Sequence, residues 1–346
     1  MLTDELEYVI GVDTHRDEHT LCVLEAKTQR VCAGFAVEAS RTGYRRALRL
    51  AARRAPGART WAIEGTGSYG AGLTRFLASH GERVREIERP KRPAASKRGK
   101  SDVLDAERAA RSLLSGAAGS LPRQDERTQA LRALIVARES AVRQRSACLN
   151  ELRALIVTAP AELRERLGYR SSERLLVACS RLRVTGDPER DAYTLALRTL
   201  ARRARHLHEE AGVLERALEE HVRVQAPYLL EQAGVGAICA AVLLSAWSHS
   251  GRLRSEAAFA RLAGAAPIPA SSGQTVRHRL DRGGDRRLNR ALHTILLTRR
   301  RLDPATRAYI ARRLVEGKSE REAVRCLKRY LARSLFRLLE NPPVTT

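Results

Sequence analysis

Long apolar runs are missing from this sequence. No stretch approaches the ~20 consecutive apolar residues that a membrane-spanning helix needs, so we expect no membrane association. The first residues, MLTDELEYVI, are acidic and lack the basic start of a secretory signal peptide. The six cysteines are far apart and form no CxxC pair, which argues against a disulfide framework or a cysteine-based zinc site. These absences predict a cytoplasmic protein with reduced thiols.

Aromatic residues are also scarce, at 4% of the 346 residues, and acidic residues are outnumbered. The chain has 63 Lys and Arg against 39 Asp and Glu, which gives a formal net charge of +24. An excess of this size, spread along the chain, indicates a polyanionic partner. The alternative explanation is a general bias toward arginine in the proteins of the source organism. Such a bias tends to be accompanied by a matching number of acidic residues, which this chain lacks. With so few aromatic rings, base stacking is not expected to dominate.

The length allows two domains and a helical connector. We predict domains over residues 1–121 and 226–346, with the connector over 122–225. In the first domain, three strand-like runs are followed by alternating helices and strands, in the order β-β-β-α-β-α-β-α. This is the ribonuclease-H-like order, and it predicts an α/β domain of that type. The expected strands are 8–12, 20–26, 30–38, 59–63 and 83–87, and the expected helices are 42–55, 69–79 and the segment from Asp102 onward.

Four acids stand at the ends of these predicted elements. Asp13 ends the first strand, Glu64 ends the fourth, and Asp102 and Asp105 share one face of the third helix. A lone acid in such a place is usually a turn or helix cap. Four of them converging on one sheet edge are typical of a site that holds hard divalent cations against a phosphodiester. We therefore predict that these four residues are catalytic and bind Mg²⁺.

Basic residues accompany the acids in two places. Lys97, Arg98 and Lys100 precede Asp102, where they would attract a phosphate backbone. A second cluster lies between Arg277 and Arg301, with nine arginines and only two acids, so phosphate binding is favoured over a merely solvated surface. The predicted nucleic-acid-binding arginines of this cluster are Arg277, Arg279, Arg282, Arg286, Arg287 and Arg290.

Residues 122–225 carry almost no strand signal. Two heptad-like seams predict either an antiparallel helical hairpin or an intermolecular coiled coil. Residues 160–188 between them are expected to form an irregular connector. His206, His208 and His221 are expected to be packing or surface residues rather than ligands. The seams are Leu131, Leu134, Ala141, Cys148, Leu152 and Leu155, and then Leu200, Ala204, Leu207, Ala211, Leu214, Leu218 and His221.

The last domain is expected to be mostly helical. Residues 267–273, PIPASSG, form an exposed loop of small residues and prolines next to the arginine cluster. A serine hydroxyl in such a loop can attack phosphorus and hold a DNA strand as a phosphoserine. By composition alone, a flexible turn at Ser271 and Ser272 is the better-supported interpretation.

Several of these motifs together resemble a known family. The chain is similar to the DEDD transposases of the insertion-sequence family usually called IS-one-ten (with the IS-eleven-eleven group), relatives of the Piv DNA invertase. The resemblance extends over nearly the whole chain, and the combined pattern is specific although each piece alone is not. Ala265 departs from it, because the family usually has leucine there. The motifs are Val9–Asp13, Ile63–Tyr69 (E-x-T-G-x-Y), Lys100–Ala106 (K-S-D-x-x-D-A), Gly234–Leu244, Gly264–Pro267, Ser271–Gly273 and Gly283–Leu292.

The resemblance implies a RuvC-like domain joined by a coiled coil to a smaller transposase domain. It implies a site-specific DNA recombinase of a bacterial insertion sequence, with Mg²⁺ bound by the acids and a serine that attacks DNA. That serine corresponds to Ser272, with Ser271 as the second choice. The resemblance also implies donor and target double-stranded DNA as substrates and a non-coding guide RNA from the element. The active unit would be a homo-oligomer, a dimer or tetramer, whose acids and serine come from different protomers.

Two alternatives remain open at this point. One is a RuvC-like, metal-dependent DNA junction endonuclease in which the serine is structural. The other is a non-catalytic, basic DNA- or RNA-binding protein whose acids only cap helices. A recombinase of this kind would remain covalently bound to DNA, whereas the endonuclease would not. Nucleic-acid binding that does not depend on Mg²⁺, without strand breakage, would favour the binding protein.

Overall fold

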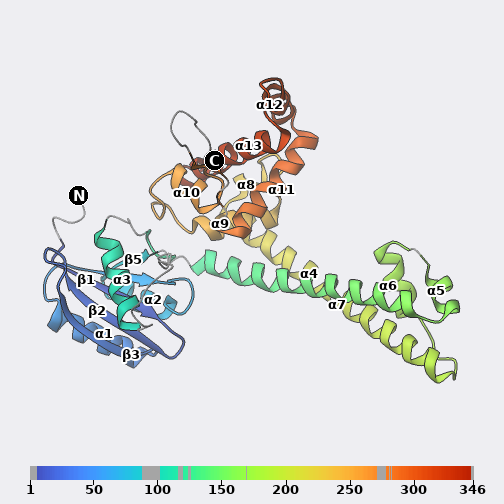
Figure 1. Cartoon of the computed structure of the whole chain (residues 1–346), viewed down its shortest axis with the longest axis horizontal. Helices are drawn as coiled ribbons and strands as arrows, with labels where there is room; N and C mark the ends of the chain where they lie inside the picture. Colours follow the sequence, from blue (N-terminus) through green and yellow to red (C-terminus); the bar gives the residue numbers. More distant parts are fainter. Residues whose placement is uncertain are drawn as a thin grey trace. The chain divides into compact units, whose positions relative to one another are not determined.

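The computed structural model describes residues 6–87, 102–115, 120–123, 126–168, 170–270, 278–279, 281 and 283–343. It divides into two compact units (Figure 1). Unit 1 comprises Met1–Asp125 and Trp247–Ala258, and unit 2 comprises Glu126–Ala246 and Phe259–Thr346. The short segment Trp247–Ala258 therefore belongs to unit 1, although the residues on either side of it in sequence belong to unit 2.

Unit 1 contains a five-stranded sheet in the order β3-β2-β1-β4-β5. Strand β1 is antiparallel to β2 and parallel to β4, and β5 is parallel to β4. The predicted order of strands and helices is confirmed. The elements are β1 (Tyr8–Thr14), β2 (Glu18–Glu25), β3 (Val31–Glu38), α1 (Arg41–Arg54), β4 (Arg59–Glu64), α2 (Ala71–Ser79), β5 (Arg83–Ile87) and α3 (Asp102–Leu114).

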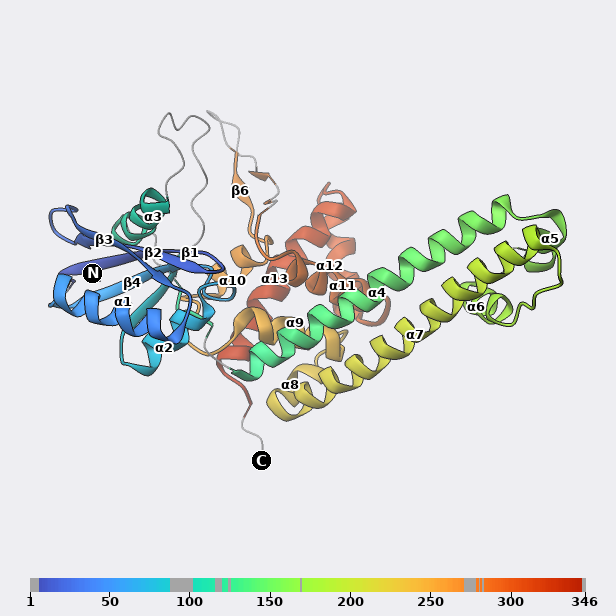
Figure 2. The same cartoon turned by 90° about the horizontal axis from the view of Figure 1, so that it is seen from below.

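Helices cover both faces of this sheet, as Figure 2 shows. Ile10 and Val12 of β1 point into the core beneath α1 and α2, whereas Val9 belongs to the cluster beneath α3. Both faces of β1 are buried, so residues that point to either face must be apolar. This explains the uninterrupted apolar run of residues 9–12. The same alternation determines toward which face of the sheet the residues at the end of the strand point.

Unit 2 begins with a helical hairpin. Tyr193 Oη donates a hydrogen bond to the carbonyl oxygen of Thr158 (3.0 Å), and Arg138 Nε donates to Glu215 Oε1 (2.7 Å). The end of the first long helix thus pairs with the start of the second, and an earlier residue of the first pairs with a later residue of the second. The two long helices are therefore antiparallel and associate within one chain. The prediction of irregular structure over 160–188 is wrong, because two short helices lie there. The elements are α4 (Glu126–Thr158), α5 (Ala161–Leu167), α6 (Ser172–Ser180) and α7 (Pro188–Gln225).

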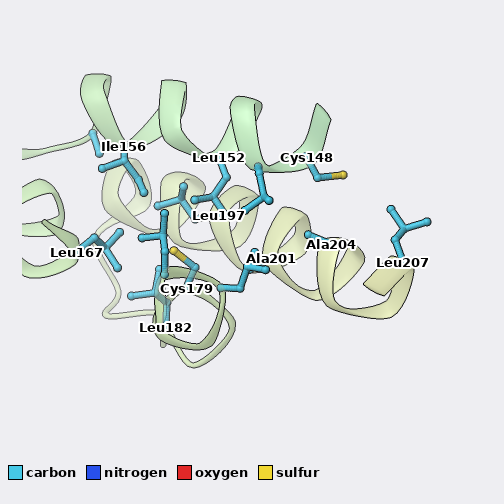
Figure 3. Close-up of a cluster of buried hydrophobic side chains, with 14 of the residues drawn as sticks. Cys148, Leu152, Ile156, Leu167, Cys179, Leu182, Leu197, Ala201, Ala204 and Leu207 are labelled. Carbon is cyan, nitrogen blue, oxygen red and sulfur yellow. The ribbon is translucent and has the colours of Figure 1, made fainter. Parts of the chain in front are cut away.

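The core of the hairpin is drawn in Figure 3. Leu152 of α4 and Leu197 and Ala201 of α7 are fully buried there, together with Cys179 of α6. The predicted seams are partly right: Ala204, Leu207 and Leu218 are buried, but Val222 takes the place expected for His221, which is exposed. His206 and His208 lie on the surface, as expected.

The remainder of unit 2 is mostly helical, also as expected. Asp285, Asp303 and Ser319 cap the N-termini of its last three helices through their side-chain oxygens. No described helix is both long enough and apolar enough to cross a membrane. The elements are α8 (Pro227–Leu230), α9 (Ala237–Trp247), α10 (Glu256–Leu262), β6 (Ile268–Pro269), β7 (His278–Arg279), α11 (Arg286–Leu302), α12 (Pro304–Val315) and α13 (Glu320–Glu340).

Candidate metal centre and nucleic-acid interface

The carboxyl ends of β1 and β4 meet at one edge of the sheet. The two strands are parallel, and Val12 is the register partner of Ile63. The next residue of each strand is an acid, Asp13 and Glu64, so the register brings the two acids to the same edge. Asp13 is only 7% exposed. A carboxylate that is nearly buried at a strand end is suited to a ligand role, although a satisfied structural acid looks similar.

Helix α3 delivers a further acid to this edge. It packs on β1, where Gly11 leaves room for the backbone of Ala106 and the side chain of Ala110. Asp102, at the first residue of α3, is thereby brought close to Asp13, and His15 lies between the two. His15 Nε2 is 3.1 Å from Asp13 Oδ2 and 3.7 Å from Asp102 Oδ1.

Asp13, His15 and Asp102 form a candidate metal centre. One ligand atom from each lies within 4.8 Å of the others. Among the residues that the structure describes, this group does not include Glu64 or Asp105. The donors are two carboxylates and an imidazole. Carboxylates fit Mg²⁺, and the imidazole extends the fit to Mn²⁺ and related ions.

The other two predicted acids have different surroundings. Asp105 Oδ1 accepts a hydrogen bond from Arg108 Nη1 at 2.5 Å, one turn further along α3. The main-chain oxygen of Glu64 accepts one from Thr14 Oγ1 at 3.0 Å, which ties the ends of β4 and β1 together. Only Oδ1 of Asp105 is engaged by Arg108 in this contact, and a carboxylate can bind a metal through its other oxygen.

His15 was not anticipated from the sequence. The available signal was its position two residues after Asp13, which places both side chains on the same side of an extended segment. A histidine just after a strand is common in surface turns, so that signal alone is weak. The second partner, Asp102, lies far along the chain, and only the packing of α3 reveals it.

The predicted nucleic-acid-binding residues are only partly visible. Arg279 lies in β7, and Arg286 is exposed at the start of α11. Arg287 Nε donates to Glu139 Oε2 of α4 at 2.8 Å, and Arg290 also pairs with Glu139. These two guanidinium groups therefore also hold α11 against the hairpin within unit 2. Outside the described residues lie Lys97, Arg98, Lys100, Arg277, Arg282 and both candidate serines, Ser271 and Ser272.

Two family models match the chain. Residues 10–159, which include all four predicted acids, match a model of DEDD transposases of the IS110 type, described as a transposase. Residues 226–311 match a model described as transposase IS116/IS110/IS902 family. The chain belongs to the IS110 family of transposases.

Two curated relatives agree with this family. A Streptomyces coelicolor protein named "Insertion element IS110 uncharacterized 43.6 kDa protein" is 32% identical over 138 residues, 39% of this chain and 34% of that protein. A Mycobacterium paratuberculosis protein named "Insertion element IS900 uncharacterized 42 kDa protein" is 34% identical over 151 residues, 42% of this chain and 37% of that protein. Each match thus spans about a third of the relative's length. The family models leave residues 160–225 and 312–346 of this transposase-family chain unmatched.

Proposed function

We propose that this chain is the transposase of a bacterial insertion sequence and that it cuts and rejoins DNA. The observation that carries the proposal is the meeting of Asp13, His15 and Asp102 at the carboxyl edge of the sheet, inside the segment that matches the DEDD transposase model. The order of the five strands and the helices on both faces supports a RuvC-like, ribonuclease-H-like domain.

Asp13, Glu64, Asp102 and Asp105 are the proposed holders of Mg²⁺. A bound divalent ion would supply charge neutralisation at the scissile phosphate and would favour deprotonation of the attacking group. Asp13 provides the fixed side of the site because it is nearly buried, whereas Asp102 is about half exposed and accessible to substrate. Arg108, which now binds Asp105, is well placed to turn toward a phosphate once that carboxylate is engaged elsewhere.

The proposed nucleophile is Ser272, with Ser271 as the second choice. Both lie between β6 and β7, whose pairing brings the ends of this segment together. In the proposed step, the serine Oγ forms a bond to phosphorus, the bond from phosphorus to the departing DNA oxygen breaks, and the hydroxyl proton is transferred to that oxygen or to water. Reversal of this step with another DNA end rejoins the strands, so the bond energy is conserved.

The proposed partners are donor and target double-stranded DNA and a guide RNA transcribed from the element. We also propose a homo-oligomer, a dimer or tetramer, in which the acids and the serine of one site come from different protomers. The formal net charge of +24 supports binding of polyanions. The family relationship supports DNA as the substrate.

A covalent-capture assay tests this function. Full-length protein, the element-end RNA, Mg²⁺ and labelled donor and target duplexes are mixed, denatured and separated on a gel. We expect a labelled protein–DNA adduct that disappears in Ser272→Ala and in Asp102→Ala and persists in Ser271→Ala. An adduct that disappears only in Ser271→Ala would move the nucleophile by one residue.

The same gel addresses the two alternative functions. Strand cleavage without an adduct, unaffected by either serine substitution, would replace the recombinase with a metal-dependent DNA junction endonuclease. Tight binding without any strand cleavage, with or without Mg²⁺, would indicate a basic DNA- or RNA-binding protein. Omitting the RNA from one lane tests the guide separately, because cleavage of the same sites without it would remove the RNA from the proposal.

A further inference from the structure

A cavity of about 1450 Å³ lies in unit 2 between α11 and α13. Its other walls are the segment 264–267, just before β6, and Arg279 of β7. Nine Lys and Arg side chains line it, against three acids. We call it the basic groove. It includes Arg286 and Arg290 of the predicted arginine cluster, but much of its charge comes from α13, which had no functional assignment from the sequence.

The acids of the basic groove do not neutralise it. Glu320 pairs with Arg300, the carboxylate of Glu322 accepts hydrogen bonds from Ser319, and Asp281 accepts one from the main-chain nitrogen of Gly283. In contrast, Arg321, Arg325 and Arg329 are exposed and form no ion pair with a carboxylate of the described residues. The groove therefore holds a strong excess of positive charge, which favours a bound polyanion.

The charge of α13 is arranged along one side. Arg321, Arg325 and Arg329 follow one another at four-residue spacing along one side of the helix, with Lys328 beside them, whereas Ala323 on the opposite side is fully buried. With a rise of about 1.5 Å per residue, Arg321 and Arg329 are about 12 Å apart along the helix. That length corresponds to three or four phosphates of a DNA strand, at about 3.4 Å of axial rise each.

Inside the groove, burial and the neighbouring Arg325 lower the pKa of Lys328. Burial, Lys328 and Arg300 likewise lower the pKa of His293. Burial is the larger cause in both cases, and a bound phosphate would counteract the smaller contribution of the neighbouring cations.

Hydrogen bonds inside the groove link it to the part of the chain that precedes the candidate serines. Lys328 Nζ donates to Asn289 Oδ1 (3.1 Å), and Asn289 Nδ2 donates to the carbonyl oxygen of Ala263 (2.6 Å). These bonds fix the chain immediately before segment 264–267, which leads into β6. The groove thus begins where the β6–β7 hairpin begins, and the candidate serines lie between those two strands.

We propose that the basic groove binds the sugar–phosphate backbone of the DNA strand that the serine attacks. The inference rests on the proposed function and assigns α13, outside both matched family regions, to DNA binding. Arg321, Arg325 and Arg329 are its phosphate-binding residues. Lys328 and Asn289 are positioning residues that hold the base of the hairpin beside that strand. DNA is favoured over RNA because the groove adjoins the hairpin whose serine acts on DNA.

The test uses the full chain with Arg321→Ala, Arg325→Ala and Arg329→Ala combined. The matched control removes the same charge from exposed arginines of α7, through Arg202→Ala, Arg203→Ala and Arg216→Ala. Binding of a donor DNA duplex and of a duplex RNA of equal length is measured across a salt series. For the groove variant we expect DNA affinity about tenfold lower or weaker still, and a salt slope reduced by about 2 to 3. The α7 control should bind DNA within about twofold of the wild type.

The possible outcomes distinguish DNA binding by the groove from the proposed reaction of the serine with DNA. An unchanged DNA affinity and salt slope in the groove variant would overturn the proposal, and so would a loss restricted to RNA. Weaker DNA binding in the groove variant alone supports DNA binding by the groove, and the covalent-capture assay decides separately whether the serine acts on the bound strand. A melting curve checks that the variant folds, and the charge reversal Arg321→Glu repeats the test with one exposed substitution, expected to weaken DNA binding further than Arg321→Ala.

Discussion

Gly11 of β1 lies directly against Ala106 of α3. A β-carbon on Gly11 would stand 1.9 Å from the Ala106 carbonyl oxygen and 2.9 Å from the β-carbon of Ala110. Distances that short are excluded, so only glycine lets the helix approach the strand this closely. Asp102 begins α3 one turn before Ala106, and Asp13 follows Gly11 by two residues. The contact therefore sets the separation of the two carboxylates.

Gly11→Ala should move α3 away from β1 and dismantle the candidate metal centre. We expect a loss of about 1–3 kcal/mol in the free energy of unfolding from overpacking, with weakened binding of Mn²⁺ and Mg²⁺. Gly34→Ala is the matched control, because its added β-carbon would have its nearest neighbours at 3.8 Å. Thermal melting and isothermal titration with each metal provide the measurement. Metal affinity in Gly11→Ala equal to that of Gly34→Ala would show that α3 does not control the site.

His15→Ala should change which metal the centre prefers. The imidazole is a good ligand for Mn²⁺ and a poor one for Mg²⁺. We expect affinity for Mn²⁺ to fall about tenfold or more, with a smaller change for Mg²⁺, whereas Asp13→Asn should weaken both. Titration calorimetry of the variants, with His206→Ala as a surface control, measures the difference. Equal losses for the two metals in His15→Ala would mean that His15 orients Asp13 instead of binding the ion.

Much of unit 1 was predictable because its signals are local. An apolar run that ends on an acid predicted both β1 and the place of Asp13, and the Asp102 helix was predicted in the same way. The contribution of His15 was not predictable, because it depends on the Gly11 contact between elements far apart in the chain. Asp105 differs, because its ion pair with Arg108 is three residues away on the same helix, a spacing that is visible in the sequence.

The error over residues 160–188 has a physical explanation. The segment is bounded by two prolines, and both begin helices: Pro160 stands at the N-cap of α5 and Pro188 in the first turn of α7. At those positions a fixed φ and a missing N–H cost little, so proline begins a helix instead of ending one. Gly168 then ends α5 with a positive φ of 51°. The breakers marked helix boundaries within a folded segment.

Leu197→Ala should strongly destabilise the helical hairpin, and Leu195→Ala should not. Leu197 is fully buried between α4, α6 and α7, whereas Leu195, on the same helix, is 56% exposed. The buried substitution should cost about 2–5 kcal/mol through lost burial and the cavity that it leaves. Chemical denaturation followed by far-ultraviolet circular dichroism measures both variants. Similar unfolding curves for the two would contradict the intramolecular packing drawn in Figure 3.

Arg252→Ala should destabilise unit 1, although residue 252 follows most of unit 2 in sequence. The Arg252 side chain is 3% exposed, and its Nη2 lies 3.2 Å from Glu86 Oε2 on β5. His249, in the same segment of unit 1, also contacts an earlier part of that unit, with Nε2 3.1 Å from the carbonyl oxygen of Pro122. Because the Glu86 carboxylate is still 21% exposed, losing its partner should cost less than in a fully buried pair, about 1–3 kcal/mol. Arg254→Ala, at an exposed position two residues on, is the control, and equal melting temperatures would show that the segment is not anchored.

His19 makes the stability of unit 1 depend on pH. It is fully buried in β2, its ring stacks on Tyr44 with centroids 5.8 Å apart, and neither ring nitrogen has a hydrogen-bond partner among the described residues. Burial lowers the pKa of His19 and the nearby His15 adds to this, while the backbone of Glu18 and the Asp13 carboxylate oppose the shift only in part. As the pH falls through about 6.5, the imidazole of His19 is protonated in the unfolded chain but stays neutral in the folded chain. The free energy of unfolding therefore falls with pH until the folded-state pKa is passed, where this contribution levels off.

His19→Leu should remove that dependence. Both tryptophans, Trp61 and Trp247, belong to unit 1, so their fluorescence during urea denaturation reports on this unit. Between about pH 7.5 and 5.5 we expect the wild type to lose stability with a slope of at most about 1.4 kcal/mol per pH unit from this residue. His206→Leu, at an exposed position of α7, should keep the wild-type slope. A slope that survives in His19→Leu would have to come from a different group, since the buried imidazole that refuses the proton would be gone.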